Sequence, residues 1–155
     1  EPLLGKEYEQ AYDLVLHPEF SLIGYRAVDN GRNIVVLNSV EYAGGEYSSK
    51  PFFTYDGSEL CFLGCNNDCF INVNGRNYPI LNELTLNSVY AKKPNSETVA
   101  YTTSTSLIVR DLQFSTLYAG KMVDEVSTPI YNWKLNRYEA IGRISDRLYL
   151  MYCNF

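Results

Sequence analysis

Residues 21–39 read SLIGYRAVDNGRNIVVLNS, in which two apolar runs flank Asp29-Asn30-Gly31-Arg32. Asn-Gly between apolar runs is the strongest short signal for a β-hairpin, because both turn residues of a type I′ turn need positive φ. The two runs, Ser21–Val28 and Asn33–Ser39, are therefore predicted to be paired antiparallel strands.

The same turn chemistry recurs further along the chain. Asp56-Gly57 lies between Phe52–Tyr55 and Glu59–Leu63, and Asn74-Gly75 lies between Cys69–Val73 and Tyr78–Leu81. Successive hairpins imply antiparallel pairing and exclude a doubly wound parallel sheet. Further strands are predicted at Leu84–Ala91, Val99–Thr103, Leu107–Phe114, Tyr138–Ile144 and Leu148–Cys153. Residues 118–133 show no clear pattern and are compatible with a long loop.

The first segment follows a different period. Its apolar residues recur at helical spacing, and Pro18 follows them. These residues, predicted to pack a helix on the sheet, are Leu4, Tyr8, Ala11, Tyr12, Val15 and Leu16. We therefore predict an α+β fold that is mostly β, with a helix over about 4–17 and an antiparallel region over about 20–155. No internal repeat or break in composition is apparent, so residues 1–155 are predicted to form one domain.

Composition narrows the class of protein. Hydrophobic residues make up 46% of the chain, which is typical of a folded globular protein. The net charge is -5 without a cluster of Lys and Arg, so nucleic acid is not an expected partner. A membrane is expected to be contacted only through a segment absent from this chain.

Four cysteines, Cys61, Cys65, Cys69 and Cys153, bear on compartment and chemistry. Their spacing lacks the Cys-x2-Cys pair of zinc ribbons, so no metal is expected. Two disulfides in three alternative connectivities, and therefore an extracytoplasmic location, are favoured over four thiols in a cytosolic core. In one arrangement Cys153 pairs with a member of the cluster, while the remaining two close a loop around Asn66-Asn67-Asp68.

Catalytic motifs are absent from the sequence. The single histidine, His17, is predicted to lie on the surface at the end of the helix, and no nucleophile, Walker or Rossmann pattern is present. Paired carboxylates of a glycosidase are conceivable, yet nothing singles out two of the 18 acidic residues. We therefore expect a non-catalytic protein without a cofactor.

Aromatic residues around Gly44-Gly45 are the candidate binding residues. Tyr42, Tyr47, Phe52 and Phe53 lie in a loop-like stretch, and loops on a rigid sheet often carry binding sites. Nearby Asn66, Asn67, Asp68, Asn72 and Asn74 could offer oxygens to calcium, but ordinary turn chemistry explains them better.

One segment resembles a known family. The run Cys69–Gly75, followed by Pro79 and the apolar stretch Leu84–Tyr90, is similar to a pattern in type IV pilin-like proteins, although Asn72 stands where that pattern prefers aspartate. The resemblance implies a pilin or pseudopilin subunit of a filament or secretion assembly, anchored by a helix upstream, with protein partners and a role in adhesion. The alternative is a receptor- or carbohydrate-binding β domain of a toxin, phage or virus, with a glycan receptor.

Overall fold

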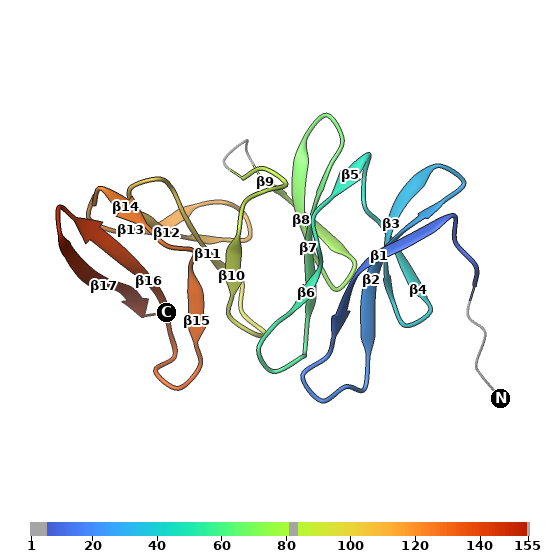
Figure 1. The fold of residues 1–155 in the computed structure, drawn as a ribbon, viewed down its shortest axis with the longest axis horizontal. Coiled ribbons are helices and arrows are strands. Elements are labelled where there is room, and N and C mark those ends of the chain that lie inside the picture. Colours follow the sequence, from blue (N-terminus) through green and yellow to red (C-terminus); the bar gives the residue numbers. More distant parts are fainter. Residues whose placement is uncertain (1–5, 81–83, 155) are drawn as a thin grey trace. The chain divides into compact units, whose positions relative to one another are not determined.

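The computed structural model describes residues 6–80 and 84–154, and these residues form β-strands connected by turns and loops (Figure 1). They contain no α-helix. The chain forms two compact units, Glu1–Asn87 (unit 1) and Ser88–Phe155 (unit 2). Each unit holds two antiparallel sheets, so the predicted α+β class is wrong and the described chain is all-β.

Unit 1 contains sheets A and B. Sheet A is a four-stranded meander of β1 (Gln10–Leu16), β2 (Ile23–Asp29), β3 (Arg32–Leu37) and β4 (Val40–Ala43). Sheet B is formed by β5 (Tyr47–Ser48), β6 (Phe52–Phe53), β7 (Leu60–Cys65), β8 (Cys69–Val73) and β9 (Arg76–Ile80). The short strands β5 and β6 both pair with β7, so together they act as one interrupted strand.

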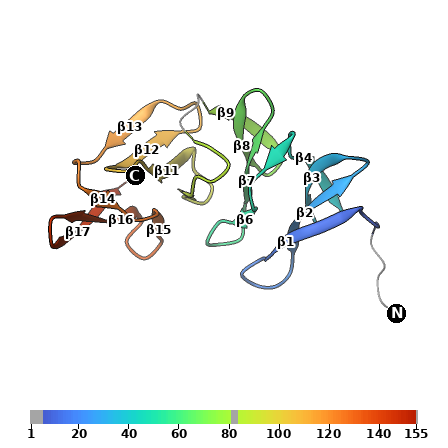
Figure 2. The ribbon, with the colours of Figure 1, turned by 45° about the horizontal axis from the view of Figure 1, so that its top comes forward.

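Unit 2 contains sheets C and D. Sheet C is a meander of β10 (Tyr90–Lys92), β11 (Thr98–Thr102), β12 (Leu107–Asp111) and β13 (Thr116–Ala119). Sheet D is formed by β14 (Glu125–Val126), β15 (Ile130–Asn132), β16 (Arg137–Ile144) and β17 (Arg147–Asn154). Figure 2 shows the same succession of hairpins from a second direction. β14 and β15 fall within residues 118–133, so that stretch is not one long loop.

The prediction of an N-terminal helix is wrong, because a β-bulge places apolar residues of a strand at the spacing expected for a helix. Between Tyr12 and Val15, β1 contains one residue more than the facing part of β2, and Asp13 has φ 56°. An extra residue in one strand turns a spacing of two into a spacing of three on the same face. Tyr12 and Val15 therefore lie at helical spacing in a strand. Of the other predicted packing residues, Tyr8 precedes β1, Ala11 and Leu16 lie in β1, and Leu4 lies outside the described residues.

The hairpins read from Asn-Gly are confirmed. Asn30 and Gly31 connect β2 to β3 with φ of 50° and 70°, and Asn74 and Gly75 connect β8 to β9 with φ of 48° and 88°. These left-handed conformations are those that a type I′ turn requires. The turn residues thus set the register of both hairpins.

The four sheets repeat one pairing register, which the sequence analysis missed. The first hairpin of each sheet contains an equivalent pair: Val15↔Gly24, Phe52↔Cys61, Ala91↔Ala100 and Ile130↔Glu139, spaced by 37, 39 and 39 residues. The turn of this hairpin is also repeated in sheets A and B. Phe20 N–H donates to His17 O in sheet A, and at the equivalent positions of sheet B Gly57 N–H donates to Thr54 O. Chains with a period of 20–50 residues are typically arrays of one supersecondary unit. The repeat lies in pairing positions and not in residue identity.

In each unit, the first sheet packs on the second through equivalent faces. We define the forward face of a sheet as the one bearing the Val15-equivalent pair, and the back face as the opposite one. The forward face of sheet A, with Val15, Val35 and Leu37, packs on Leu60 and Phe62 of the back face of sheet B. In unit 2, Ala91 and Ala100 of the forward face of sheet C pack with Tyr138 and Ala140 of the back face of sheet D.

Tyr138 anchors the core of unit 2 and predicts an alkaline transition. Its buried hydroxyl accepts Lys93 N–H (2.9 Å) and donates to Thr98 O (2.8 Å), and burial raises the pKa of Tyr138 to about 12. In the unfolded chain the same tyrosine ionises near pH 10. The protonated Tyr138 therefore stabilises the folded state fully below pH 10, and about 2–3 kcal/mol of the free energy of unfolding is lost as pH rises to 12. Urea unfolding over this range measures the loss. Tyr138→Phe is expected to be less stable near neutrality but to lose less between pH 10 and 12. An unchanged difference between the two proteins would contradict the assignment.

Candidate functional site

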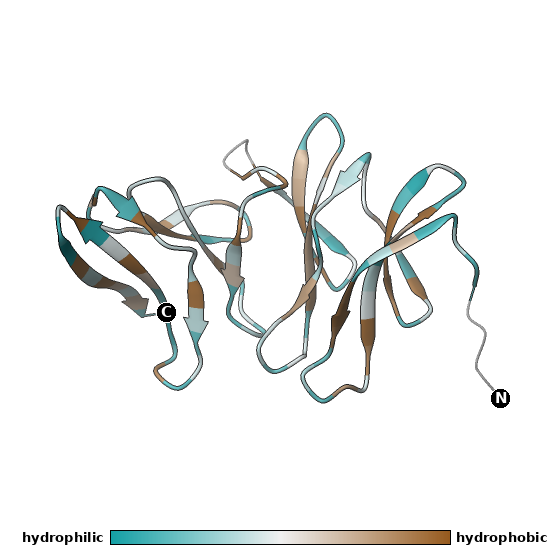
Figure 3. Ribbon diagram, in the orientation of Figure 1, coloured by the Kyte–Doolittle hydropathy of each residue, from teal (hydrophilic) through white to brown (hydrophobic). Residues whose placement is uncertain are grey.

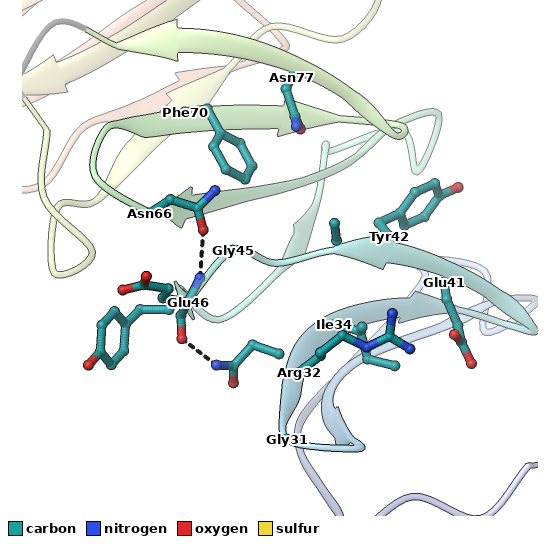
Figure 4. A pocket seen from close by; sticks show the side chains of 13 residues that line it. Gly31, Arg32, Ile34, Glu41, Tyr42, Gly45, Glu46, Asn66, Phe70 and Asn77 are labelled. Atoms are coloured by element: carbon teal, nitrogen blue, oxygen red, sulfur yellow. Dashed lines mark hydrogen bonds between the residues drawn. The ribbon is translucent and has the colours of Figure 1, made fainter.

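A groove of about 760 Å³ opens in unit 1 between sheets A and B (Figure 4). β3 and β4 supply one side, and the chain entering β5, the β7–β8 turn and strands β8 and β9 supply the other. Its volume lies in the range of small-ligand sites. Its lining residues include Arg32, Asn33, Tyr42, Glu46, Tyr47, Asn66 and Phe70.

Two amide side chains hold the segment at the bottom of the groove. Glu46 N–H donates to Asn66 Oδ1 (2.9 Å), and Asn33 Nδ2 donates to Glu46 O. Figure 4 shows this backbone held from both sides, between β3 and the β7–β8 turn. Because both polar groups of Glu46's backbone are engaged, the side chains of Glu46 and Tyr47 are presented from a fixed segment.

Gly45 permits this close approach. It forms an isolated parallel bridge with Cys65, and its φ is +79°. A Cβ at this position would lie 2.5 Å from Cys65 O, closer than a side-chain carbon can approach. The position therefore needs glycine for both its backbone conformation and its space.

The groove combines aromatic rings with polar side chains. Tyr42, Tyr47 and Phe70 line it, and Tyr47 is 62% exposed. Glu46 contributes a carboxylate, whereas Arg32 and Glu41 border the groove on strands whose register places their side chains on the opposite face of sheet A, with Ala27, Ile34 and Val36. Glu41 bonds Lys6 (2.7 Å), and this hydrogen bond lowers the pKa of Glu41. A carboxyl that stays ionised is poorly suited to act as a general acid.

The disulfide closes the turn that carries Asn66. Cys65 and Cys69, at the facing ends of β7 and β8, are joined, and Asn66 N–H donates to Asp68 O (3.0 Å) within the loop. A five-residue loop of this kind contributes about 2 kcal/mol by restricting the unfolded chain. The bond thus holds the groove's amide in place.

The second predicted disulfide is not formed. Cys61 and Cys153 are buried thiols, Cys61 in β7 of unit 1 and Cys153 in the core of unit 2 with Tyr138 and Met151. Buried cysteine behaves as a small apolar side chain. Burial also raises the pKa of the Cys153 thiol to about 11, so it remains protonated near neutrality.

The predicted binding residues divide between groove and core. Tyr42 and Tyr47 line the groove, whereas Phe53 packs on the core between sheets A and B, and Phe52 lies beside it in β6. Arg32, Asn33, Asn66 and Phe70 were not recognised as groove residues. They come from β3, the β7–β8 turn and β8, and only the tertiary structure brings these segments together.

His17 is not the predicted surface residue at the end of a helix. It is buried after β1, where Nδ1 accepts Glu19 N–H (3.1 Å) and the ring meets Phe53 edge-on. It does not line the groove. Its role in this structure is to cover Gly57, whose Cβ position lies 1.9 Å from Nε2.

The asparagine-rich stretch performs turn chemistry, as expected. Asn74 Oδ1 accepts Leu60 N–H (2.8 Å), and Asn72 Oδ1 accepts Gly75 N–H (2.9 Å). Within residues 6–80 and 84–154, no group of three His, Cys, Asp or Glu side chains is placed to hold a metal ion.

Comparison with known proteins adds no relative: no protein-family model matches the chain, and no curated protein matches it. In the part of the chain that the structure describes, no helix has the length and apolar character needed to cross a membrane. The pilin resemblance stays a prediction, and the N-terminal helix on which its wider order rested is a strand over Gln10–Leu16.

Proposed function

We propose that this chain is a non-catalytic binding domain of an extracytoplasmic protein, and that the groove of unit 1 binds a short neutral oligosaccharide. The observation that carries the proposal is the exposed Tyr47 ring beside a backbone segment held by Asn33 and Asn66. The Cys65–Cys69 disulfide supports an oxidising compartment.

The ligand class follows from the groove's chemistry. A sugar ring has an apolar C–H face, which packs on an aromatic ring, and a rim of hydroxyls that donate and accept hydrogen bonds. Tyr42, Tyr47 and Phe70 offer rings, while Glu46 and Asn77 offer hydrogen-bonding groups beside them. Since Glu46 is negatively charged and the side chains of Arg32 and Glu41 lie on the other face of sheet A, the groove residues named above offer no cation to an anionic ligand, and a neutral ligand is favoured.

The test is binding to a panel of neutral oligosaccharides on a glycan array, followed by calorimetry on the best ligand. Tyr47→Ala is expected to lower the affinity at least about fivefold, since truncating an aromatic anchor costs more than about 1 kcal/mol. Tyr55→Ala is the matched control, because Tyr55 is an exposed tyrosine of unit 1 that does not line the groove.

Three results would count against the proposal. Equal losses in the Tyr47 and Tyr55 variants would place the site elsewhere, and absence of binding across the panel would reject the ligand class. Release of new reducing ends from a bound oligosaccharide would show a glycosidase instead of a binding domain.

A further inference from the structure

The forward face of sheet D carries an exposed apolar surface. Its central pair is Ile141 and Leu150, directly opposite each other in β16 and β17. The exposed apolar residues of this face are Ile130, Ile141, Leu148, Leu150 and Tyr152. Glu139 lies on the same face between Ile130 and Tyr152, where it pairs with Arg137 (2.6 Å), and Arg137 lies over the Tyr152 ring. Exposed apolar side chains gathered on one face and bordered by polar residues are typical of protein interaction sites.

The back face of sheet A is its counterpart. Leu16 and Ile23 are paired there and exposed, and the neighbouring Leu14 is exposed as well. Tyr8 covers only the part of this face around Ala27 and Val36. Figure 3 shows the hydrophobic ends of β1 and β2 beside the loop that joins them.

The repeat indicates which kind of face each of these two surfaces would contact. In unit 1 the forward face of sheet A receives the back face of sheet B, and in unit 2 the forward face of sheet C receives the back face of sheet D. Ile23 and Tyr25 of sheet A occupy the repeat positions that Leu60 and Phe62 occupy in sheet B. The back face of sheet A is thus equivalent to faces that already pack on a forward face.

We propose that the forward face of sheet D binds the back face of sheet A of a second copy of this chain, which extends the repeat from one copy to the next. The contact is heterologous, because two different surfaces meet, and it allows closed rings or longer chains. β14 and β15 form one interrupted strand beside β16, so the face of sheet D is three strands wide and at most eight residues long; it covers about 390 Å², or about 780 Å² for both partners. Stable complexes bury more than roughly 1,200 Å², so the association is expected to be weak.

The test is sedimentation velocity of the full chain at concentrations from about 1 μM to about 1 mM, the range in which weak complexes form. The weight-average mass is expected to rise with concentration. Leu150→Lys, on sheet D, and Ile23→Lys, on sheet A, should each hold the protein as a monomer. Met122→Lys is the control, because Met122 is exposed between β13 and β14, outside both faces, and should associate as the native chain does.

Mixing the two monomeric variants distinguishes this contact from any other. The Leu150→Lys protein retains an intact sheet A face and the Ile23→Lys protein an intact sheet D face, so a mixture should form a one-to-one dimer and nothing larger. A native chain that stays monomeric throughout overturns the proposal. Association abolished by Leu150→Lys but not by Ile23→Lys would show sheet D packing on itself, and it overturns the proposal equally. The circular dichroism spectra of the three variants should match that of the native chain, which shows that a loss of association is not caused by misfolding.

Discussion

Gly57→Ala is expected to lower the free energy of unfolding of unit 1 by about 3–4 kcal/mol, because two costs fall on one position. Gly57 has φ +73°, so any L side chain is strained there. The new Cβ would also lie 1.9 Å from His17 Nε2. The ring cannot simply turn away, since His17 Nδ1 accepts Glu19 N–H and the ring packs on Phe53.

Gly31→Ala is the control for this substitution. Gly31 has nearly the same φ, +70°, but no atom lies within 4 Å of its Cβ position. It should therefore lose only about 1 kcal/mol, from the backbone alone. Urea unfolding followed by far-ultraviolet circular dichroism measures both variants, and hydrogen exchange of β6 and β7 assigns the loss to unit 1. Equal losses at the two glycines would show that His17 does not constrain this turn.

Gly45→Ala is expected to destroy the groove as a binding site. Its Cβ would lie 2.5 Å from Cys65 O and 2.9 Å from Cys65 C, which are backbone atoms of β7 and cannot move aside as a side-chain tip can. The segment carrying Glu46 must therefore shift, and its hydrogen bonds to Asn33 and Asn66 are lost. We expect oligosaccharide affinity to fall more than about tenfold, since a misplaced site loses several contacts together.

The same control applies to the groove. Gly31 also lines it, and Gly31→Ala adds a methyl group without displacing backbone, so its affinity should change by less than about threefold. Calorimetry with the best oligosaccharide from the array gives both values. Native affinity in a folded Gly45→Ala protein would falsify the proposed construction of the groove.

The sequence alone was sufficient for features set by neighbouring residues. The Asn30-Gly31 and Asn74-Gly75 turns could be located because positive φ at two successive residues is a local demand that few residue pairs meet. The antiparallel order of the sheets followed, since a two-residue turn allows nothing else. Tyr42 and Tyr47 were found for a similar reason, because they flank a glycine pair close to them in the chain.

The first strand was misread because local period alone cannot distinguish a helix from a strand with a bulge. Tyr12 and Val15 have helical spacing, and only their partners on β2, Arg26 and Gly24, show that one residue is extra. The repeat was missed for a related reason. Phe52↔Cys61 and Ile130↔Glu139 share a position in the pairing but no residue type, so the periodicity exists in the hydrogen-bond register and not in the letters.

What the sequence determined by itself is therefore the two Asn-Gly turns and the antiparallel pairing beside them. The tertiary structure decided which cysteines join, because a disulfide needs Cys65 and Cys69 to face each other across β7 and β8. It also decided the groove, where Asn33 and Asn66 meet one backbone segment from opposite sides. Such contacts join residues far apart in the chain, and their energies depend on a geometry that no short stretch of sequence contains.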